Sequence, residues 1–340
     1  MSASAHPVEF ATTLFCPAFA GGEIARRSEE LGFDIQLFGE NHNMCADVFG
    51  ELRLAAAATT RLRLECGPVN FVTRDPGVIA SAIAAVQLLS DGRAICGIAR
   101  GDSAVALAGR APQRHAGLER DLGVLRTYLG RGVVDHGERE SSLQWIGQRE
   151  YTPPPIQLVC SGPRAIRLAA TTADRIGLSV GANPERVGWA MAIIDDALAA
   201  AGRTRADVRV GLFLPMAITS DRAGAADALR PRVAGWAHMS SFPGNDLAQQ
   251  PEVMRRVTEA LRTGYDYRYH KAGVPADNPN TRIVDGEFAD WFGVGGPPAY
   301  LIERLGQLVE AGIDYFVSVL EGTEQERFAA EVMPTVRNAR

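Results

Sequence analysis

The sequence has little of what marks secreted, nucleic-acid-binding or membrane proteins. Its five cysteines are odd in number and lack CxxC spacing, which argues against a disulfide framework and favours a reducing compartment. No basic run is present, and 40 acidic residues outnumber 35 basic ones, so we expect no nucleic-acid partner. No apolar run reaches the roughly 20 residues that span a bilayer. With no basic segment leading into an apolar one at the N-terminus, we predict a cytoplasmic protein without a membrane partner.

What the sequence does contain is a regular alternation of strand-like and helix-like segments. Buried-strand patterns occur at residues 8–15, 33–38, 61–66, 94–99, 156–160, 175–180, 208–218 and 315–320. Helix-like segments follow them at residues 22–31, 47–60, 76–89, 114–129, 163–172, 184–201, 298–311 and 324–336. Eight such units predict an α/β fold, a (β/α)8 TIM barrel that forms a single domain over residues 1–340.

Two stretches depart from this alternation. Residues 133–151, with alternating residues in SLQWIGQREY, predict a hairpin outside the barrel. A stretch from about residue 236 to residue 291 predicts an insertion before the last helix–strand unit. The ring-bearing residues of this insertion include Trp236, His238, Phe242, Tyr265, Tyr267, Tyr269, His270, Trp291 and Phe292. They could close over a flat cofactor or an apolar substrate, pack the insertion onto the barrel, or form a dimer contact.

Glycine-containing turns follow several of the predicted strands. Two of these turns lead directly into a helix, where unpaired N–H groups and the helix dipole favour anions. The phosphate-binding candidates are therefore Ser161, Gly162, Pro163, Arg164, Gly181, Ala182 and Asn183. Ordinary strand-to-helix turns are the alternative interpretation.

Three titratable residues at strand ends are candidates for proton transfer. Asp102 follows a buried strand, and desolvation there would raise the pKa of its carboxyl and suit a general acid, although the residue could equally cap a short helix. Glu40 and His42 lie together after the second strand, and His42 could shuttle a proton or be a surface hydrogen-bonding group. The spacing His42-x-x-Cys45 lacks a second pair of ligands, so we predict no metal.

Four segments carry a resemblance to a known family. They are FDIQLFGENHN, RLRLECGPVN with the following residues as far as RGDSA, CSGPRAIRLAATTADRIGLSVGANPERV, and GVGGPPAYLIERLGQLVEAGIDYFV. Together they resemble the bacterial-luciferase-like flavin and deazaflavin oxidoreductases, and within them the branch similar to methylenetetrahydromethanopterin reductase. The resemblance implies coenzyme F420, or alternatively FMN, held at the C-terminal mouth of the barrel, and a homodimer.

The resemblance also implies roles for individual residues. A bulge after the third strand would fall on Gly67, Pro68, Val69 and Asn70, with Pro68–Val69 the expected cis bond. Ser161, Gly162 and Pro163 would line the ribityl chain, and Gly181, Ala182 and Asn183 would bind the phosphate. The remaining predicted cofactor-binding residues are Asn41, Arg164, Arg100, Gly101 and Ser103.

One departure from the family pattern affects the expected mechanism. Many relatives carry an acidic residue followed by histidine after the second strand, whereas this chain has Glu40 followed by Asn41. An amide does not titrate, so the acid or base role is open between Asp102, His42 and Glu40. The expected function is hydride transfer between F420 or FMN and a small organic substrate. The alternatives are an FMNH2-dependent monooxygenase that activates oxygen and a non-catalytic ligand-binding barrel.

Overall fold

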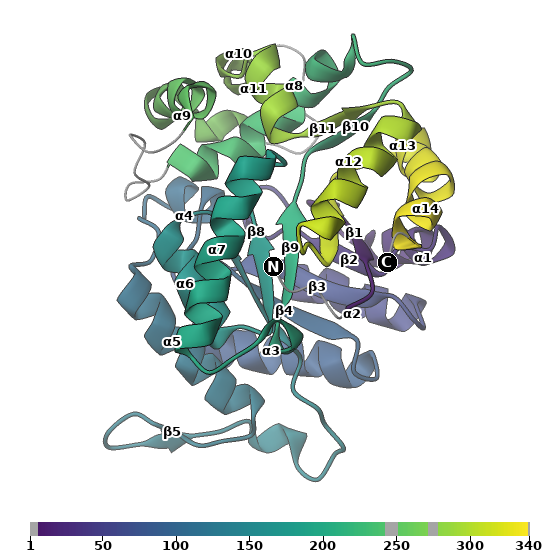
Figure 1. Cartoon of the computed structure of the whole chain (residues 1–340). Helices are drawn as coiled ribbons and strands as arrows, with labels where there is room; N and C mark the ends of the chain where they lie inside the picture. The colour runs from purple at the N-terminus through teal and green to yellow at the C-terminus, as the bar shows by residue number, and fades with distance from the viewer. Residues whose placement is uncertain (1–5, 242–250, 271–277, 339–340) are drawn as a thin grey trace. The chain divides into compact units, whose positions relative to one another are not determined.

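The computed structural model describes residues 6–241, 251–270 and 278–338 and confirms the predicted barrel (Figure 1). Eight parallel strands close in the order β1-β12-β9-β8-β7-β4-β3-β2. Their bounds are β1 Glu9–Leu14, β2 Ile35–Phe38, β3 Arg63–Val69, β4 Ala94–Ile98, β7 Ile156–Cys160, β8 Arg175–Leu178, β9 Arg209–Phe213 and β12 Tyr315–Ser318. Most of their residues are buried, as the near-continuous apolar runs predict for a parallel sheet covered by helices.

The helices between the strands are α1 Gly21–Glu30, α2 Val48–Ala58, α3 Pro76–Leu89, α4 Ser103–Leu107, α5 His115–Leu129, α6 Pro163–Thr172, α7 Pro184–Ala200, α12 Pro298–Glu310, α13 Gly322–Arg327 and α14 Met333–Arg337. Most begin and end within two residues of their predicted bounds, but α4 was not predicted, and the helix expected over residues 324–336 is divided by a π-helical stretch at Phe328–Val332. The Asp47 carboxylate accepts from the backbone N–H of Gly50 at 3.0 Å and so caps α2. Gly32 ends α1 with a φ of +82°, a conformation that glycine adopts without strain.

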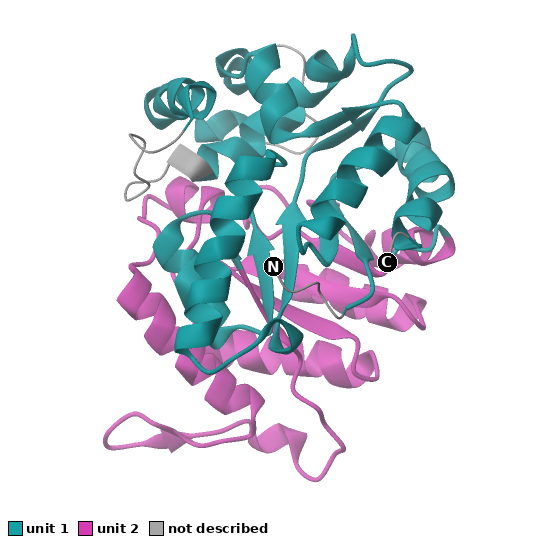
Figure 2. Cartoon of the chain, viewed as in Figure 1, with its two compact units in different colours: residues 1–13, 31–33, 159–340 teal, residues 14–30, 34–158 magenta. Residues whose placement is uncertain are grey.

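The chain divides into two compact units, coloured separately in Figure 2. Unit 1 comprises residues 1–13, 31–33 and 159–340, and unit 2 comprises residues 14–30 and 34–158. Within unit 1, the buried carboxylate of Glu9 forms ion pairs with Arg175 at 2.9 Å and Arg209 at 2.6 Å. The guanidinium of Arg175 lies 4.2 Å from the centre of the Tyr315 ring, so these residues form one packed ionic cluster.

The inserted segment of unit 1 starts earlier than predicted. The single strand expected over residues 208–218 is instead two strands, β9 and β10 (Met216–Ile218), because Pro215 between them has no N–H to donate to a ladder. β10 pairs with β11 (Val294–Gly296) in a separate two-stranded sheet. The chain between these two strands includes α8 Ala225–Ala237, η3 His238–Ser241, α9 Glu252–Gly264, η5 Tyr267–Tyr269, α10 Pro279–Ile283 and α11 Gly286–Phe292.

The helices of this insertion share an apolar core of their own. α8, α9, α10 and α11 lie together at one end of unit 1 (Figure 1). Trp236, Tyr265 and Trp291 pack against this core, and Phe292 is part of it, which supports a packing role for several of the predicted aromatic residues. Phe242 lies outside the described residues.

The predicted hairpin is present but is shorter than its sequence pattern. β5 (Val134–Asp135) and β6 (Glu140–Ser141) pair antiparallel and extend from the body of unit 2 (Figure 1). The alternating stretch after Ser141 instead contains a 3₁₀ turn at Gln144–Ile146, which bonds locally rather than across a ladder.

All five cysteines are free thiols. Four of them are buried, whereas Cys45 is partly exposed. Burial, followed by the neighbouring Glu51 carboxylate, raises the pKa of the Cys16 thiol to about 12, and burial alone does the same for Cys160. Over the described residues, no helix combines the length and apolar character needed to cross a bilayer.

Candidate functional site

The predicted site residues lie after strand ends, some in unit 1 and some in unit 2. In unit 2, β3 carries the predicted bulge, since its register with β4 shifts between Cys66 and Val69. The prediction that Pro68–Val69 is the cis bond is wrong, because the cis bond is Gly67–Pro68. The amide that precedes proline is the one for which the cis form costs little.

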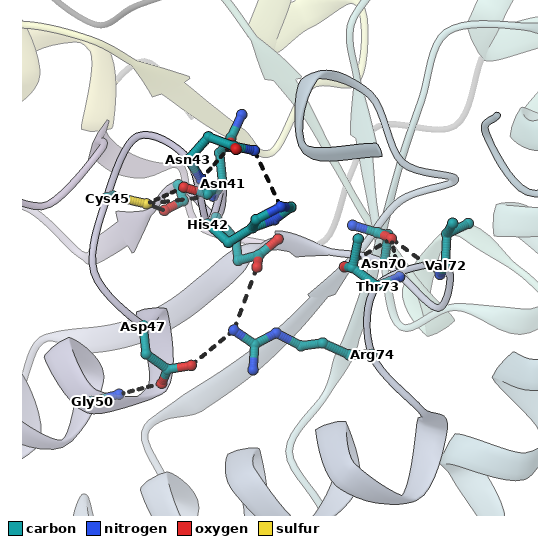
Figure 3. Close-up of polar contacts among 12 residues, drawn as sticks. Asn41, His42, Asn43, Cys45, Asp47, Gly50, Asn70, Val72, Thr73 and Arg74 are labelled. Carbon is teal, nitrogen blue, oxygen red and sulfur yellow. Dashed lines mark hydrogen bonds and ion pairs between the residues drawn. The ribbon is translucent and has the colours of Figure 1, made fainter. Parts of the chain in front are cut away.

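The bulge requires glycine at position 67. Gly67 is buried with a φ of +94°, and a Cβ there would lie 2.2 Å from the backbone nitrogen of Val69. Beyond the bulge, the Asn70 side chain folds back on its own loop (Figure 3). Its Oδ1 accepts from the N–H groups of Val72 and Thr73 at 3.1 and 3.0 Å and from the Thr73 hydroxyl at 3.1 Å. This turn leads the chain to Arg74.

Arg74 lies between two carboxylates that come from the β2–α2 segment (Figure 3). Its Nη2 is 3.4 Å from Oε1 of Glu40 and 2.8 Å from Oδ2 of Asp47. The Glu40 side chain is only 4% exposed, and burial raises the pKa of its carboxyl, although the charge of Arg74 opposes this. Glu40 is therefore a carboxyl group suited to hold a proton.

Asn41 is fully buried, and both polar atoms of its side-chain amide form hydrogen bonds within the chain. Its Nδ2 donates to the Ser103 hydroxyl at 2.9 Å, and its Oδ1 accepts from the backbone N–H of Asn43 at 3.0 Å and from the Asn43 side chain at 3.2 Å. Asn41 thus connects the residues that follow β2 to those that follow β4. By contrast, the His42 side chain is exposed and contacts Asn43 (Figure 3).

The residues that follow β4 form a tight turn before α4. The Arg100 Nε donates to the carbonyl of Gln113 at 2.7 Å, and Gly101 is buried with a φ of +96°. Asp102 occupies the position before α4, and its backbone carbonyl accepts from Val105 and Ala106. Its carboxylate makes no capping hydrogen bond to the helix, so the predicted N-cap role is not what holds this side chain.

In unit 1 the two predicted phosphate turns differ in how their N–H groups are used. The Asn183 Oδ1 accepts from Glu185 and Arg186 and so caps α7, and the N–H of Ala182 donates to Phe292 at 2.8 Å. Gly181 has a φ of +82° and packs against Phe292, where a Cβ would lie 2.9 Å from the ring.

The other turn, before α6, has no side-chain cap. Gly162 occupies the N-cap position and Pro163 is the first helical residue, while the Ser161 hydroxyl donates to the carbonyl of Met239 at 3.2 Å. Arg164 is exposed. Of the two turns, residues 161–164 leave the helix N-terminus more open to an anion.

Two sets of side-chain contacts were not identified from the sequence. Arg74 and Asp47 belong to the unit 2 cluster, and the only sequence signal for Arg74 is its place in the turn between β3 and α3. In unit 1, the His238 ring stacks on Tyr265 at a centroid distance of 4.2 Å, and the Tyr265 hydroxyl hydrogen-bonds Nδ1 of His270. These rings were predicted individually, but their contacts depend on tertiary structure.

Comparison with known proteins places the chain among related enzymes. A sequence model of the luciferase-like monooxygenase family matches residues 19–315. The chain is 26% identical over 302 residues to 5,10-methylenetetrahydromethanopterin reductase of Archaeoglobus fulgidus, with 86% of each chain covered. It is 25% identical over 300 residues to an F420-dependent glucose-6-phosphate dehydrogenase of Beutenbergia cavernae, covering 84% of this chain and 82% of the relative.

A solved structure supports the same fold. An F420-dependent secondary alcohol dehydrogenase in complex with an F420-acetone adduct superposes with a TM-score of 0.76 at 16% identity, over 98% of this chain and 100% of the other. At that identity the likeness establishes the fold alone. With the family match over residues 19–315, the chain belongs to the luciferase-like monooxygenase family.

Proposed function

We propose that this protein is an F420-dependent oxidoreductase that transfers a hydride between the coenzyme and a small organic substrate. The observation that carries the proposal is the arrangement after β2, β3 and β4, where glycine backbone at Gly67 and Gly101 lies in the same unit as the acidic side chains of Glu40 and Asp102. A relative whose name includes F420 supports this choice of coenzyme over FMN.

The residues present fit a flat redox coenzyme. Gly67 and Gly101 are buried with φ values of +94° and +96°, and a Cβ at either position would meet protein atoms, so glycine allows the tight turns before Asn70 and Asp102 against which we propose that the ring lies. The hydrogen bond between Asn41 and Ser103 joins the turn after β2 to the turn after β4. Bound there, F420 would supply the hydride chemistry, and the chain would supply orientation and a proton.

Within unit 1, the start of α6 is suited to an anionic group. Among the described residues, the N–H groups of Arg164 and Ala165 have no hydrogen-bond partner, and the helix lacks a side-chain cap. A phosphate at this end would gain from these donors and from the helix dipole. We propose that Ser161, Gly162, Pro163 and Arg164 contact it, with Gly181, Ala182 and Asn183 shaping the neighbouring wall through packing.

Among the three candidate acids, Glu40 is the best suited to hold and release a proton. Its Oε2 is buried without a hydrogen-bond partner among the described residues, and burial raises the pKa of its carboxyl. Asp102 is half-buried and is the second candidate, whereas His42 is exposed.

Kinetics of three variants test this assignment. We expect Glu40→Gln to lower kcat by about 10²–10⁴-fold, as loss of a general acid does. Asp102→Asn should also lower turnover, both variants should keep near-normal coenzyme affinity, and His42→Ala should change kcat little. Wild-type turnover in both carboxamide variants would remove these carboxyl groups from the mechanism.

A second candidate is an FMNH2-dependent monooxygenase, which the family description favours. Titration with FMN and with F420, followed by fluorescence, identifies the coenzyme. Oxygen uptake with reduced FMN then separates a monooxygenase from a reductase. Binding of neither coenzyme would support a non-catalytic barrel. The homodimer stays a prediction, which light scattering of the purified protein tests.

A further inference from the structure

Arg74 is shared unequally between a buried and an exposed carboxylate (Figure 3). The same Nη2 atom is 2.8 Å from Asp47, whose side chain is 54% exposed, and 3.4 Å from Glu40, whose side chain is 4% exposed. The shorter contact is therefore made to the carboxylate that needs it less, since water can solvate Asp47.

The buried side of this arrangement has unused hydrogen-bonding capacity. Oε2 of Glu40 and Nε of Arg74 are both buried, and neither has a hydrogen-bond partner among the described residues. Arginine commonly binds a carboxylate with two parallel hydrogen bonds, which would satisfy both atoms. The geometry therefore keeps Glu40 from the full pairing that would fix it as an anion.

Asp47 is itself held in place by the backbone. Its Oδ1 accepts from the N–H of Gly50 at 3.0 Å and caps α2, while its Oδ2 accepts from Arg74. The guanidinium also lies 5.3 Å from the centre of the Phe49 ring, on the same helix. The Asp47 carboxylate and the Phe49 ring, both at the start of α2, thus hold the Arg74 guanidinium close to Asp47.

We propose that Arg74 is a positioning residue that sets how readily Glu40 gives up its proton, and that Asp47 limits this effect by competing for the guanidinium. The inference rests on the proposed function, in which Glu40 handles the proton. The charged and titratable groups that face Glu40 are Arg74 from the β3–α3 turn, and His42, Cys45 and Asp47 from the β2–α2 segment. Of these, Arg74 and His42 favour the anion of Glu40 and Asp47 disfavours it, which agrees with the geometry.

Two substitutions should shift the apparent pKa of Glu40 in opposite directions. Arg74→Gln removes the positive charge, so we expect the apparent pKa of Glu40 to rise by about one unit or more. Asp47→Asn frees Arg74 to pair with Glu40, so the pKa should fall, while asparagine still caps α2. Arg74→Lys keeps the charge and should give a smaller rise than Arg74→Gln, and it serves in place of that variant if Arg74→Gln does not fold.

The measurement is a pH titration of ¹³C-carboxyl-labelled glutamate by NMR on the chain without coenzyme, with Glu40→Gln identifying the signal. Arg256→Gln is the matched control, because Arg256 also bridges two carboxylates, Asp285 at 2.7 Å and Glu287 at 3.0 Å, within unit 1. It should leave the Glu40 titration unchanged. The alkaline limb of the kcat–pH profile, where a general acid loses its proton, should move with the titration in each variant.

The outcomes separate this inference from the proposed function. The proposed role of Arg74 is overturned if Asp47→Asn and the Arg74 variants shift the apparent pKa of Glu40 in the same direction. It is also overturned if Asp47→Asn causes no shift of that pKa, or if the Arg74 variants cause none. If F420 binds and turns over while those shifts are absent, the proposed function stands without this inference. Opposite shifts in a chain that binds neither coenzyme support the coupling and refute the proposed function.

Discussion

Replacing Gly101 by alanine should destabilise unit 2 through two separable effects. The φ of +96° is a conformation that costs an L-residue about 1–2 kcal/mol. The added Cβ would also lie 2.4 Å from Cγ2 of Val105, a buried residue of α4, and overpacking of this kind costs about 1–3 kcal/mol. We therefore expect Gly101→Ala to lower the free energy of unfolding by roughly 2–5 kcal/mol.

A double-mutant cycle isolates the steric effect. Val105→Ala alone should cost roughly 1–3 kcal/mol, because it leaves a cavity in the core. In the double variant the methyl groups of valine are gone, so the clash is relieved. The two substitutions together should then destabilise by about 1–3 kcal/mol less than the sum of the single ones.

Urea unfolding followed by circular dichroism measures these free energies. Gly109→Ala is the matched control, since Gly109 has a φ of +69° but a Cβ at this position would meet no atom within 4 Å. It should show only the conformational cost of about 1–2 kcal/mol and no rescue by Val105→Ala. Strict additivity of Gly101→Ala and Val105→Ala would refute the packing of this turn against α4.

Three further predictions concern stability. Glu9→Gln should lower the free energy of unfolding by about 3–5 kcal/mol in urea titrations, because it leaves the buried Arg175 without its carboxylate; a loss below about 1 kcal/mol would contradict this. Burial alone would raise the pKa of the Glu29 carboxyl, but hydrogen bonds from three backbone N–H groups outweigh burial, and the net result is a lowered pKa. The stability that the Glu29 carboxylate contributes should be present above about pH 4.3 and lost as pH falls through the lowered pKa of the folded chain. The loss of unfolding free energy caused by Glu29→Gln should therefore become smaller in acid. A loss that does not depend on pH would refute this role of Glu29. Asn183→Ala should cost about 1 kcal/mol in thermal or urea unfolding, because it removes the cap of α7, and an unchanged midpoint would argue against that cap.

The barrel could be predicted from the sequence because its evidence is local. Each strand is a short apolar run, and each helix has its own start and stop residues, such as Asp47 and Gly32. The errors also have local physical causes. Pro215 divides the expected strand over residues 208–218, and the prediction for the bulge placed the cis bond one residue too late, at Pro68–Val69.

The candidate site could be predicted only in part. The turns that carry Glu40, Gly67 and Asp102 follow from strand ends, so their positions were accessible. Which side chains meet was not, because Asn41 and Ser103 are 62 residues apart and Glu40 and Arg74 are 34 apart. These pairs form only when neighbouring strands align in the folded chain, and no short sequence motif predicts that alignment.

If the proposed function is right, the turns after β2, β3 and β4 hold a deazaflavin ring. A crystal structure of the protein grown with F420 tests it most directly. We predict the ring against the backbone of Gly67–Asn70, within hydrogen-bonding reach of Glu40 or Asp102. An ordered coenzyme bound elsewhere on the chain, or none at saturating F420, would contradict the account.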